Sequence, residues 1–438
     1  MARRADFSLT ASPGSLLAVA ARASGARIVD EDGRSYLDAC GGAMVMSLGH
    51  CHPRLVEVVR RQVAELSFTY RFSFRNGPML ELAEELRSVS PLAGTWCFFN
   101  SSGSESVESA IQLARRYWQL CGRPAKTDLI SRWPSFHGST HGALSLSGSK
   151  WRAFYEPVLD KHPVAPVPNG DIRRRRAPAE EAAWAARELE DALVRRGAAN
   201  VAAVVIEPVT GASGAAIAPP PGYMAELRRV CDHHDALLVF DETITAFGRT
   251  GEWFAACHWP DATPDIITFA KGVTSGIVPF SGVLVSGELA EVFEQSADGF
   301  PYGHTFSGYP LGCAVAAEAI RVIKDEDLVA ESRRKGALLR ERLDALTAGS
   351  PRIGDIRGLG LLQGLELVQD RETLAPPPGG ASRLVAACRE RGLMIYPCPT
   401  PMGVTTIEAV MLAPPLTIAD GELDEVVAIL GDALAATA

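Results

Sequence analysis

The chain has very little lysine. It carries 43 lysine and arginine residues in total, and only six of them are lysine: Lys126, Lys150, Lys161, Lys271, Lys324 and Lys335. Five of these lie in polar loops or charged helical segments. Lys271 differs, because it follows the apolar and β-branched residues 266–270 and precedes Gly272. A chain that otherwise uses arginine thus places one lysine at the end of a predicted buried strand.

Other absences exclude broad classes of function. The formal net charge is −9, so nucleic acid is not an expected partner. The nine cysteines contain no CxxC pair, which favours free thiols in a reducing compartment. No segment approaches the roughly 18 uninterrupted apolar residues of a membrane helix, and the amino-terminal segment is a poor signal peptide. We therefore expect a soluble, cytoplasmic protein with no membrane association.

The pattern that is present is one of apolar strands alternating with helices. Strand-like runs lie at residues 201–208, 236–243, 265–272 and 280–287, and helix-like spacing separates them. Continuous apolar strands of this kind predict an α/β fold with a mostly parallel sheet that is covered on both faces.

Three chemically useful side chains stand where these predicted strands end. They are Glu207, Asp241 and Lys271. Ligands of parallel α/β sheets bind outside the carboxyl ends of the strands. We therefore expect these three residues to converge on one crevice.

The length and the change of pattern along the chain predict more than one domain. With 438 residues the chain exceeds a typical single core. We predict a large domain over residues 66–315 and a smaller α/β domain over residues 316–438. Residues 1–65, which include a hairpin pattern, are expected to pack with the smaller domain.

The stretch "FFNSSGSESVESAIQLARRYW" (98–118) predicts a helix that begins near Ser104. The free N–H groups of Gly103 and Ser104 would then face outward at a helix N-terminus, an arrangement that binds phosphate. Taken alone, an ordinary serine N-cap explains this stretch as well.

A phosphate site, a strand-end lysine and a strand-end aspartate together match the needs of pyridoxal 5'-phosphate (PLP). The lysine amine forms a Schiff base with the aldehyde, and the aspartate keeps the pyridine nitrogen protonated. Arginine cannot replace the lysine, because it does not deprotonate to attack a carbonyl. This requirement accounts for the placement of Lys271.

The motifs then resemble those of the class III (ω-type) aminotransferases, which have the fold-type-I architecture of PLP enzymes. The resemblance runs from about residue 25 to the C-terminus. It rests on "SSGSES", "SFHGSTHGALSLSG", "VVIEPVTGASG", "VFDETITAFGRTG", "ITFAKGVTSG", "GHTFSGYPLGCAVA" and "LAPPLTI", in this order. It implies a homodimer with shared active sites, acting on a small-molecule amino donor and a keto or aldehyde acceptor.

The resemblance also implies roles for individual residues. Lys271 is the Schiff-base lysine and the acid/base of the 1,3-proton shift, and Asp241 pairs with the pyridine nitrogen. The remaining implied cofactor contacts are Ser102, Gly103 and Ser104 at the phosphate, Thr305 from the neighbouring subunit, Phe136 and Thr243 on the two faces of the ring, and His137 and Glu207 close by. The family usually has tyrosine in place of Phe136 and often valine in place of Thr243.

Two departures from the family concern the substrate. Relatives that act on α-carboxylated substrates usually have an arginine after the "GLMI" strand, where this chain has Tyr396. Glu207 matches the glutamate that pairs with that arginine, so here it is either neutralised by another arginine or free to meet a substrate amine. Met44 stands where several amine-specific relatives have a bulky aromatic residue, which predicts a wider pocket.

Other functions fit the sequence less well than a PLP-dependent aminotransferase, with the exception of other PLP reactions. The glycines of "GLGLLQG" have the wrong spacing for a nicotinamide site. The histidine pairs 137/141 and 233/234 lack further clustered ligands, so no metal site is predicted. The intact Lys271 and Asp241 disfavour a non-catalytic protein. Aminomutation, decarboxylation and racemisation or epimerisation remain open, because the same fold and cofactor support them.

Overall fold

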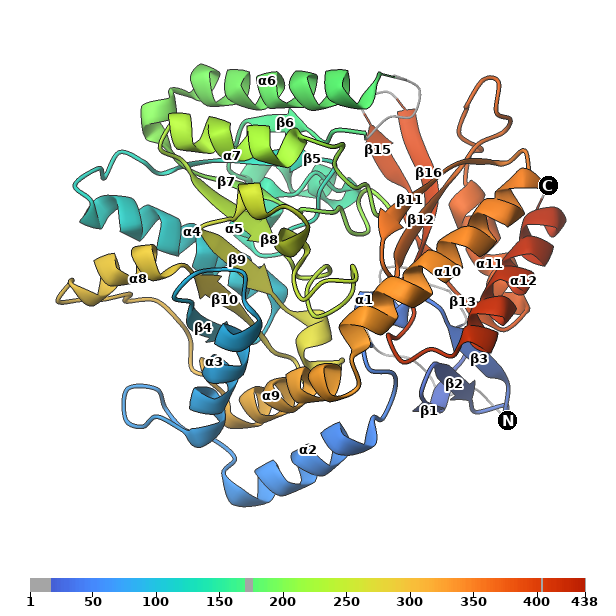
Figure 1. Ribbon diagram of the computed structural model, residues 1–438, viewed down its shortest axis with the longest axis horizontal. Coiled ribbons are helices and arrows are strands. Elements are labelled where there is room, and N and C mark those ends of the chain that lie inside the picture. Colours follow the sequence, from blue (N-terminus) through green and yellow to red (C-terminus); the bar gives the residue numbers. More distant parts are fainter. Residues whose placement is uncertain (1–16, 170–175, 403–404, 438) are drawn as a thin grey trace.

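The computed structural model describes residues 17–169, 176–402 and 405–437 (Figure 1). Its central sheet contains β4 (Trp96–Asn100), β5 (Asp128–Trp133), β6 (Val164–Pro166), β7 (Val201–Ile206), β8 (Leu237–Asp241), β9 (Ile266–Phe269) and β10 (Ser281–Val285). The strand order is β4-β10-β9-β8-β7-β5-β6. β10 runs antiparallel to both of its neighbours, and the other pairs are parallel. The predicted α/β fold with a mostly parallel sheet is confirmed.

The middle strands are apolar throughout because both faces of the sheet are covered. Every residue of β7 and β8 is buried. Alternate side chains enter two different cores: Val204 and Ile206 pack into one, whereas Ala203 and Val205 pack into the other. The charged residue of these two strands, Asp241, stands at the carboxyl end of β8, which is where chemistry can be placed.

Helices form the two covering layers. Apolar residues of α4 (Gly103–Leu120), α5 (His141–Leu146) and α8 (Gly287–Glu294) pack on one face. The other core includes residues of α2 (Pro53–Glu65), α3 (Gly77–Val89), α6 (Pro178–Arg196), α7 (Tyr223–His233) and α9 (Pro310–Asp325). Short helical turns lie at α1 (Gly41–Met44) and, as 3-10 helices, at Lys150–Phe154, Glu156–Val158, Ala198–Asn200, Ala255–His258, Pro260–Ala262 and Lys271–Thr274.

The C-terminal part forms a second, antiparallel sheet beside the first (Figure 1). Its strands are β11 (Ile353–Leu359), β12 (Leu362–Leu367), β14 (Tyr396–Pro397), β15 (Thr400–Met402) and β16 (Thr405–Leu412). The helices of this part are α10 (Leu328–Ala348), α11 (Gly380–Glu390) and α12 (Asp420–Ala436).

The N-terminal strands share a third sheet with a C-terminal strand. β1 (Ala20–Ser24), β2 (Arg27–Asp30) and β3 (Ser35–Asp38) are antiparallel, and β13 (Leu393–Met394) pairs with β3 in parallel. The division into domains at 65/66 and 315/316 remains a prediction. The second of these positions falls inside α9, a continuous helix that packs against α2 and α3.

Among the described helices, none combines the length and the apolar character that crossing a bilayer requires.

Candidate active site

A cavity of about 350 Å³ opens at the carboxyl ends of the central strands. It brings together the three strand-end residues that the sequence singled out: Glu207 after β7, Asp241 at the end of β8, and Lys271 just after β9. The N-terminus of α4 closes another side of this cavity with Ser102, Gly103 and Ser104. Phe136, His137 and Thr243 also line it.

Lys271 is held in an unusual backbone conformation at the cavity wall. Its φ is 46°, in the left-handed region, and it begins the 3-10 helix Lys271–Thr274. Ser275, which ends this turn, accepts a hydrogen bond at Oγ from the N–H of Leu48 at 2.9 Å. Burial lowers the pKa of Lys271 to about 8, although the charges of Asp241 and Glu207 oppose that shift. A substantial fraction of its amine is therefore neutral near pH 8.

Two other lysines are more deeply buried than Lys271, and the sequence did not indicate their burial. Lys126 is buried, and its Nζ donates to the main-chain oxygen of Val201 at 2.8 Å. Lys335 is also buried, and its Nζ donates to the oxygen of Leu416 at 2.9 Å. Both ammonium groups bond to main-chain carbonyls, whereas Lys271 is the lysine that lines the cavity.

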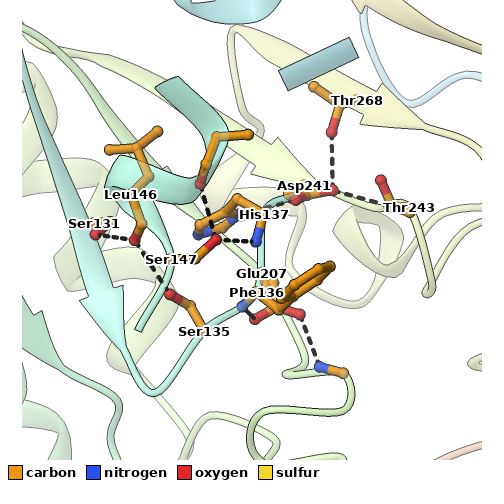
Figure 2. A network of polar contacts seen from close by, with 12 residues as sticks. Ser131, Ser135, Phe136, His137, Leu146, Ser147, Glu207, Asp241, Thr243 and Thr268 are labelled. Carbon is orange, nitrogen blue, oxygen red and sulfur yellow. Dashed lines mark hydrogen bonds and ion pairs between the residues drawn. The ribbon is translucent and has the colours of Figure 1, made fainter. Parts of the chain in front are cut away.

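Asp241 is a buried carboxylate with donors on both oxygens (Figure 2). Oδ1 accepts from Thr268 Oγ1 at 2.9 Å and from the Thr243 N–H at 3.2 Å. Oδ2 lies 2.8 Å from Nδ1 of His137, which donates to it. Desolvation opposes ionisation of Asp241, yet the His137 and Thr243 interactions hold its pKa below the ordinary value. Asp241 therefore presents a negative charge at neutral pH.

Asp241 is followed directly by a second acid with a different environment. Glu242 is fully buried and accepts from the N–H groups of Ala255 and Ala256 at 2.6 and 2.9 Å. Burial raises the pKa of Glu242 to about 7. Because successive strand residues point to opposite sides, Asp241 faces the cavity and Glu242 anchors a loop.

His137 is fixed from its main chain as well as from its ring. Its N–H donates to Ser147 Oγ at 2.8 Å, and that hydroxyl donates to the oxygen of Ala143 at 2.8 Å (Figure 2). Its Nε2 is buried and has no hydrogen-bond partner among the described residues. The ring therefore acts on Asp241 through Nδ1.

α4 begins at Gly103, next to the start that the sequence predicted near Ser104. Ser102 is the N-cap, and its hydroxyl accepts from the N–H of Glu105 at 3.3 Å. The Glu105 carboxylate in turn accepts from the N–H of Ser101 at 2.9 Å. Within the described residues, the N–H groups of Gly103 and Ser104 have no protein acceptor, so they remain available at the positive end of the helix.

Two glycines allow the chain to approach this helix end closely. A Cβ on Gly103 would lie 3.2 Å from Cγ2 of Thr243. A Cβ on Gly138 would lie 2.5 Å from Oγ of Ser104, and the φ of Gly138 is +141°. Ser104 Oγ also accepts from the N–H of Ser139 at 3.0 Å. The loop after Phe136 is therefore packed directly against the start of α4.

The Glu207 carboxylate lines the cavity and is held by two main-chain N–H groups. Its Oε1 accepts from the N–H of Gly211 at 2.9 Å, and its Oε2 accepts from the N–H of Phe136 at 3.1 Å (Figure 2). No arginine side chain among the described residues pairs with this carboxylate; Arg132 bonds the main-chain oxygen instead. Desolvation raises the pKa of Glu207, although the interactions with His137 and the two amides oppose that shift.

Met44 and Tyr396 lie behind the cavity wall rather than on its surface. Met44 is buried and has φ 59°, and the neighbouring Val45 lines the cavity. Met44 and the half-buried Tyr396 share an apolar cluster with Val209 and Ile244. Their assignment as substrate-binding residues remains a prediction.

Thr305 lies outside the cavity of its own chain, in an exposed loop. The adjacent Phe306 is 50% exposed, and its ring lies 5.8 Å from that of Phe68. Thr305 is therefore accessible from outside its own chain.

Part of the cavity surface carried no signal in the sequence analysis. The lining includes the apolar residues Val45, Val209, Ile244, Val278, Pro279 and Phe280. Single apolar residues in loops have no distinguishing spacing, so only the folded chain shows which of them reach the site. The motif "SFHGSTHGALSLSG" contains Gly138, but the need for glycine at this position arises from its close contact with Ser104.

Comparison with known proteins gives the class of this enzyme. A sequence model of the family described as Aminotransferase class-III matches residues 10–434. The chain belongs to this family, whose members depend on PLP. It is therefore a PLP-dependent aminotransferase, which moves an amino group between an amino donor and a keto acceptor.

Individual relatives match over nearly the whole chain. The uncharacterized aminotransferase YodT of Bacillus subtilis is 38% identical over 424 residues, covering 95% of each chain. The putrescine–pyruvate aminotransferase of Pseudomonas aeruginosa is 34% identical over 435 residues, covering 95% of this chain and 90% of its own. A PLP-bound amine transaminase from an uncultivated Pseudomonas species superposes with a TM-score of 0.91 at 31% identity, covering 100% of both chains. These names favour transamination over the other PLP reactions.

The residues of the cavity fit PLP chemically. An anionic carboxylate suits a protonated ring nitrogen, and a lysine with a lowered pKa suits reaction with an aldehyde. The free N–H groups at the start of α4, reached closely by two glycines, suit a phosphate.

Proposed function

We propose that this cavity holds PLP and that Lys271 is its covalent attachment point. One observation carries the proposal: Lys271, Asp241 and the N-terminus of α4 surround a single cavity. When bound, PLP acts as an electron sink that stabilises negative charge at the substrate carbon. The protein residues then bind the cofactor, orient it and move protons.

Each residue has a distinct task in this proposal. Lys271 would hold the cofactor through its amine and, as a free amine, would carry a proton on Nζ. Asp241 stays anionic and holds a proton on the ring nitrogen, supported by His137. The N–H groups of Gly103 and Ser104 bind the phosphate, while Phe136 and Thr243 cover the two faces of the ring.

For the substrate, we propose an amine, aldehyde or ketone without an α-carboxylate in one half-reaction. Among the described residues that line the cavity, Lys271 is the only lysine or arginine. A carboxylate would therefore lack the bidentate arginine partner that usually recognises it. Glu207 places carboxyl oxygens at the cavity that can accept from an amine, and apolar side chains form much of the wall. The relative named for putrescine and pyruvate pairs an amine donor with a keto acid in the same way.

We also propose a homodimer with shared active sites, in which Thr305 reaches the phosphate of the neighbouring subunit. The exposed Thr305 and Phe306 support it, because an exposed aromatic next to a polar loop is typical of an interface. A cytoplasmic location is proposed as well, in keeping with nine unpaired cysteines.

Two experiments test this function. Borohydride should fix the cofactor covalently to the wild-type protein but not to Lys271→Ala, and adduct formation in that variant would remove Lys271 from its role. Each amino donor should then be supplied alone while formation of pyridoxamine phosphate is followed. If only α-amino acids react, and neither Tyr396→Phe nor Glu207→Gln changes this, the substrate proposal fails.

A further inference from the structure

Two neighbouring histidines gain a third potential ligand when the chain folds. His233 ends α7 and His234 follows it, while Glu190 lies on α6, far upstream in the sequence. Figure 1 shows α6 and α7 side by side on the outside of the molecule, and residues of the two helices are in contact. One ligand atom from each of these residues lies within 4.8 Å of the others.

The geometry within this cluster is close to that of a metal site. Nε2 of His234 lies 3.2 Å from Oε1 of Glu190. The two imidazole rings are 4.7 Å apart at a 76° angle, so they do not stack and can turn their nitrogens to a common point. His233 is exposed, and the other two residues are partly exposed, so an ion can enter from solvent.

We propose that Glu190, His233 and His234 form a binding site for a divalent transition-metal ion, with Zn²⁺ as the best match. Two imidazoles and one carboxylate are a donor set that Zn²⁺ uses, whereas Ca²⁺ and Mg²⁺ prefer oxygen ligands alone. The exposed side of the cluster leaves the remaining coordination position to water.

The surrounding charges permit this site. Arg229 Nη2 lies 3.9 Å from Oε2 of Glu190, but its Nε also bonds Glu226 at 2.8 Å. When Glu190 turns toward an ion, Arg229 therefore keeps a carboxylate partner. The buried Lys126 donates to the main-chain oxygen of His234 at 3.4 Å and leaves the ring free to bind.

The adjacent acidic residues are engaged with arginines. Asp232 pairs with Arg228 at 2.7 Å, and Asp235 pairs with Arg123 at 3.0 Å. Each of these carboxylates already has an arginine partner, so neither is proposed as a ligand.

The site is separate from the active site, and its consequence is mechanical. His234 precedes the amino end of β8, whereas Asp241 stands at the carboxyl end of that strand, where the cavity opens. A bound ion would tie α6 to the turn that leads from α7 into β8. Ion binding stabilises the folded state that forms the site, so it should raise the unfolding temperature.

The test is a calorimetric titration of the PLP-loaded enzyme with Zn²⁺. The wild type should bind one ion per chain at this site, and its unfolding temperature should rise with Zn²⁺. His233→Ala and the conservative variant Glu190→Gln should each weaken binding by more than about tenfold. His141→Ala is the matched control, because His141 is another exposed histidine paired with an acid, Asp160, outside this cluster.

Exposed thiols are the competing ligands, at Cys51, Cys121 and Cys257. Titration with Co²⁺ separates the two cases, because thiolate ligands add a charge-transfer absorption that imidazole and carboxylate do not. Absence of that band together with weaker binding by both variants supports the site. No binding by the wild type, unchanged affinity in both variants, or a thiolate spectrum overturns it.

Discussion

Adding one methyl group at Gly138 should weaken binding of the cofactor, an effect that a matched glycine substitution elsewhere should not have. The new Cβ would lie 2.5 Å from Ser104 Oγ and 2.9 Å from both Ser104 Cα and Ala143 Cβ. Two of these contacts are with Ser104, at the start of α4, where the phosphate is proposed to bind. In the Gly138→Ala variant, the alanine side chain fits only if this helix end or the loop around residue 138 moves.

The size of the effect follows from two costs. Backbone strain in a region that side chains rarely adopt costs of order 1–3 kcal/mol. Overpacking of a close contact costs about 1–3 kcal/mol more. Displacement of the helix end relieves the overpacking, and the helix end must then return to its place when PLP binds. The overpacking cost therefore lowers the affinity for PLP by about 5- to 150-fold, since about 1.4 kcal/mol is tenfold.

The assay is a titration of apoenzyme with PLP, followed by absorbance, together with thermal unfolding. Gly122→Ala is the matched control: Gly122 also has positive φ, 74°, follows the other end of α4, and has no atom within 4 Å of an added Cβ. It should lower the unfolding temperature but leave PLP affinity unchanged.

A milder variant protects this test against loss of folding. Gly103→Ala brings its Cβ to 3.2 Å from Thr243 Cγ2, a contact that side-chain movement can relieve, so a smaller loss of affinity is expected. The reasoning is refuted if Gly138→Ala binds PLP as tightly as Gly122→Ala does, because the close packing on Ser104 would then be irrelevant to the cofactor.

Three further predictions concern the reaction. Asp241→Asn should fold, because its neighbours Thr243 and Thr268 can still donate to the amide oxygen, but turnover should fall by at least about 10²–10³-fold; near-normal turnover would contradict the assigned role. Because Lys271 is protonated below its pKa of about 8, the rate of PLP attachment to apoenzyme should rise about tenfold per pH unit and level off above pH 8. A profile that still rises toward pH 10 would disprove the lowered pKa. Mixing Lys271→Ala with an inactive Thr305→Asp variant should restore activity in mixed dimers, and no recovery after demonstrated subunit exchange would argue against shared sites.

Local sequence determined much of the scaffold and of the proposed chemistry. β7, β8 and β9 read as continuous apolar runs because both of their faces are buried, and a polar residue in such a strand is tolerated at its end. Glu207, Asp241 and Lys271 therefore stood out without a structure, and the parallel arrangement placed them at one edge. The start of α4 was also readable, because capping depends on a few consecutive residues.

The tertiary structure decided everything that depends on contacts between distant segments. The amides that hold Glu207 come from Phe136 and Gly211, and only the fold brings the former within reach. The buried ammonium group of Lys126 donates to main-chain carbonyls of Val201 and His234, which lie in other segments of the chain.

The same reason explains the site details and the metal cluster. Val45 rather than Met44 lines the cavity, in a segment where Gly41, Gly42 and Met44 all have positive φ, and side-chain type does not reveal this path of the chain. His233 and His234 carried too little signal for a metal site, because Glu190 joins them only when α6 packs beside α7. Spacing along the chain reports neighbours within one helix or strand, whereas sites between elements depend on how those elements pack.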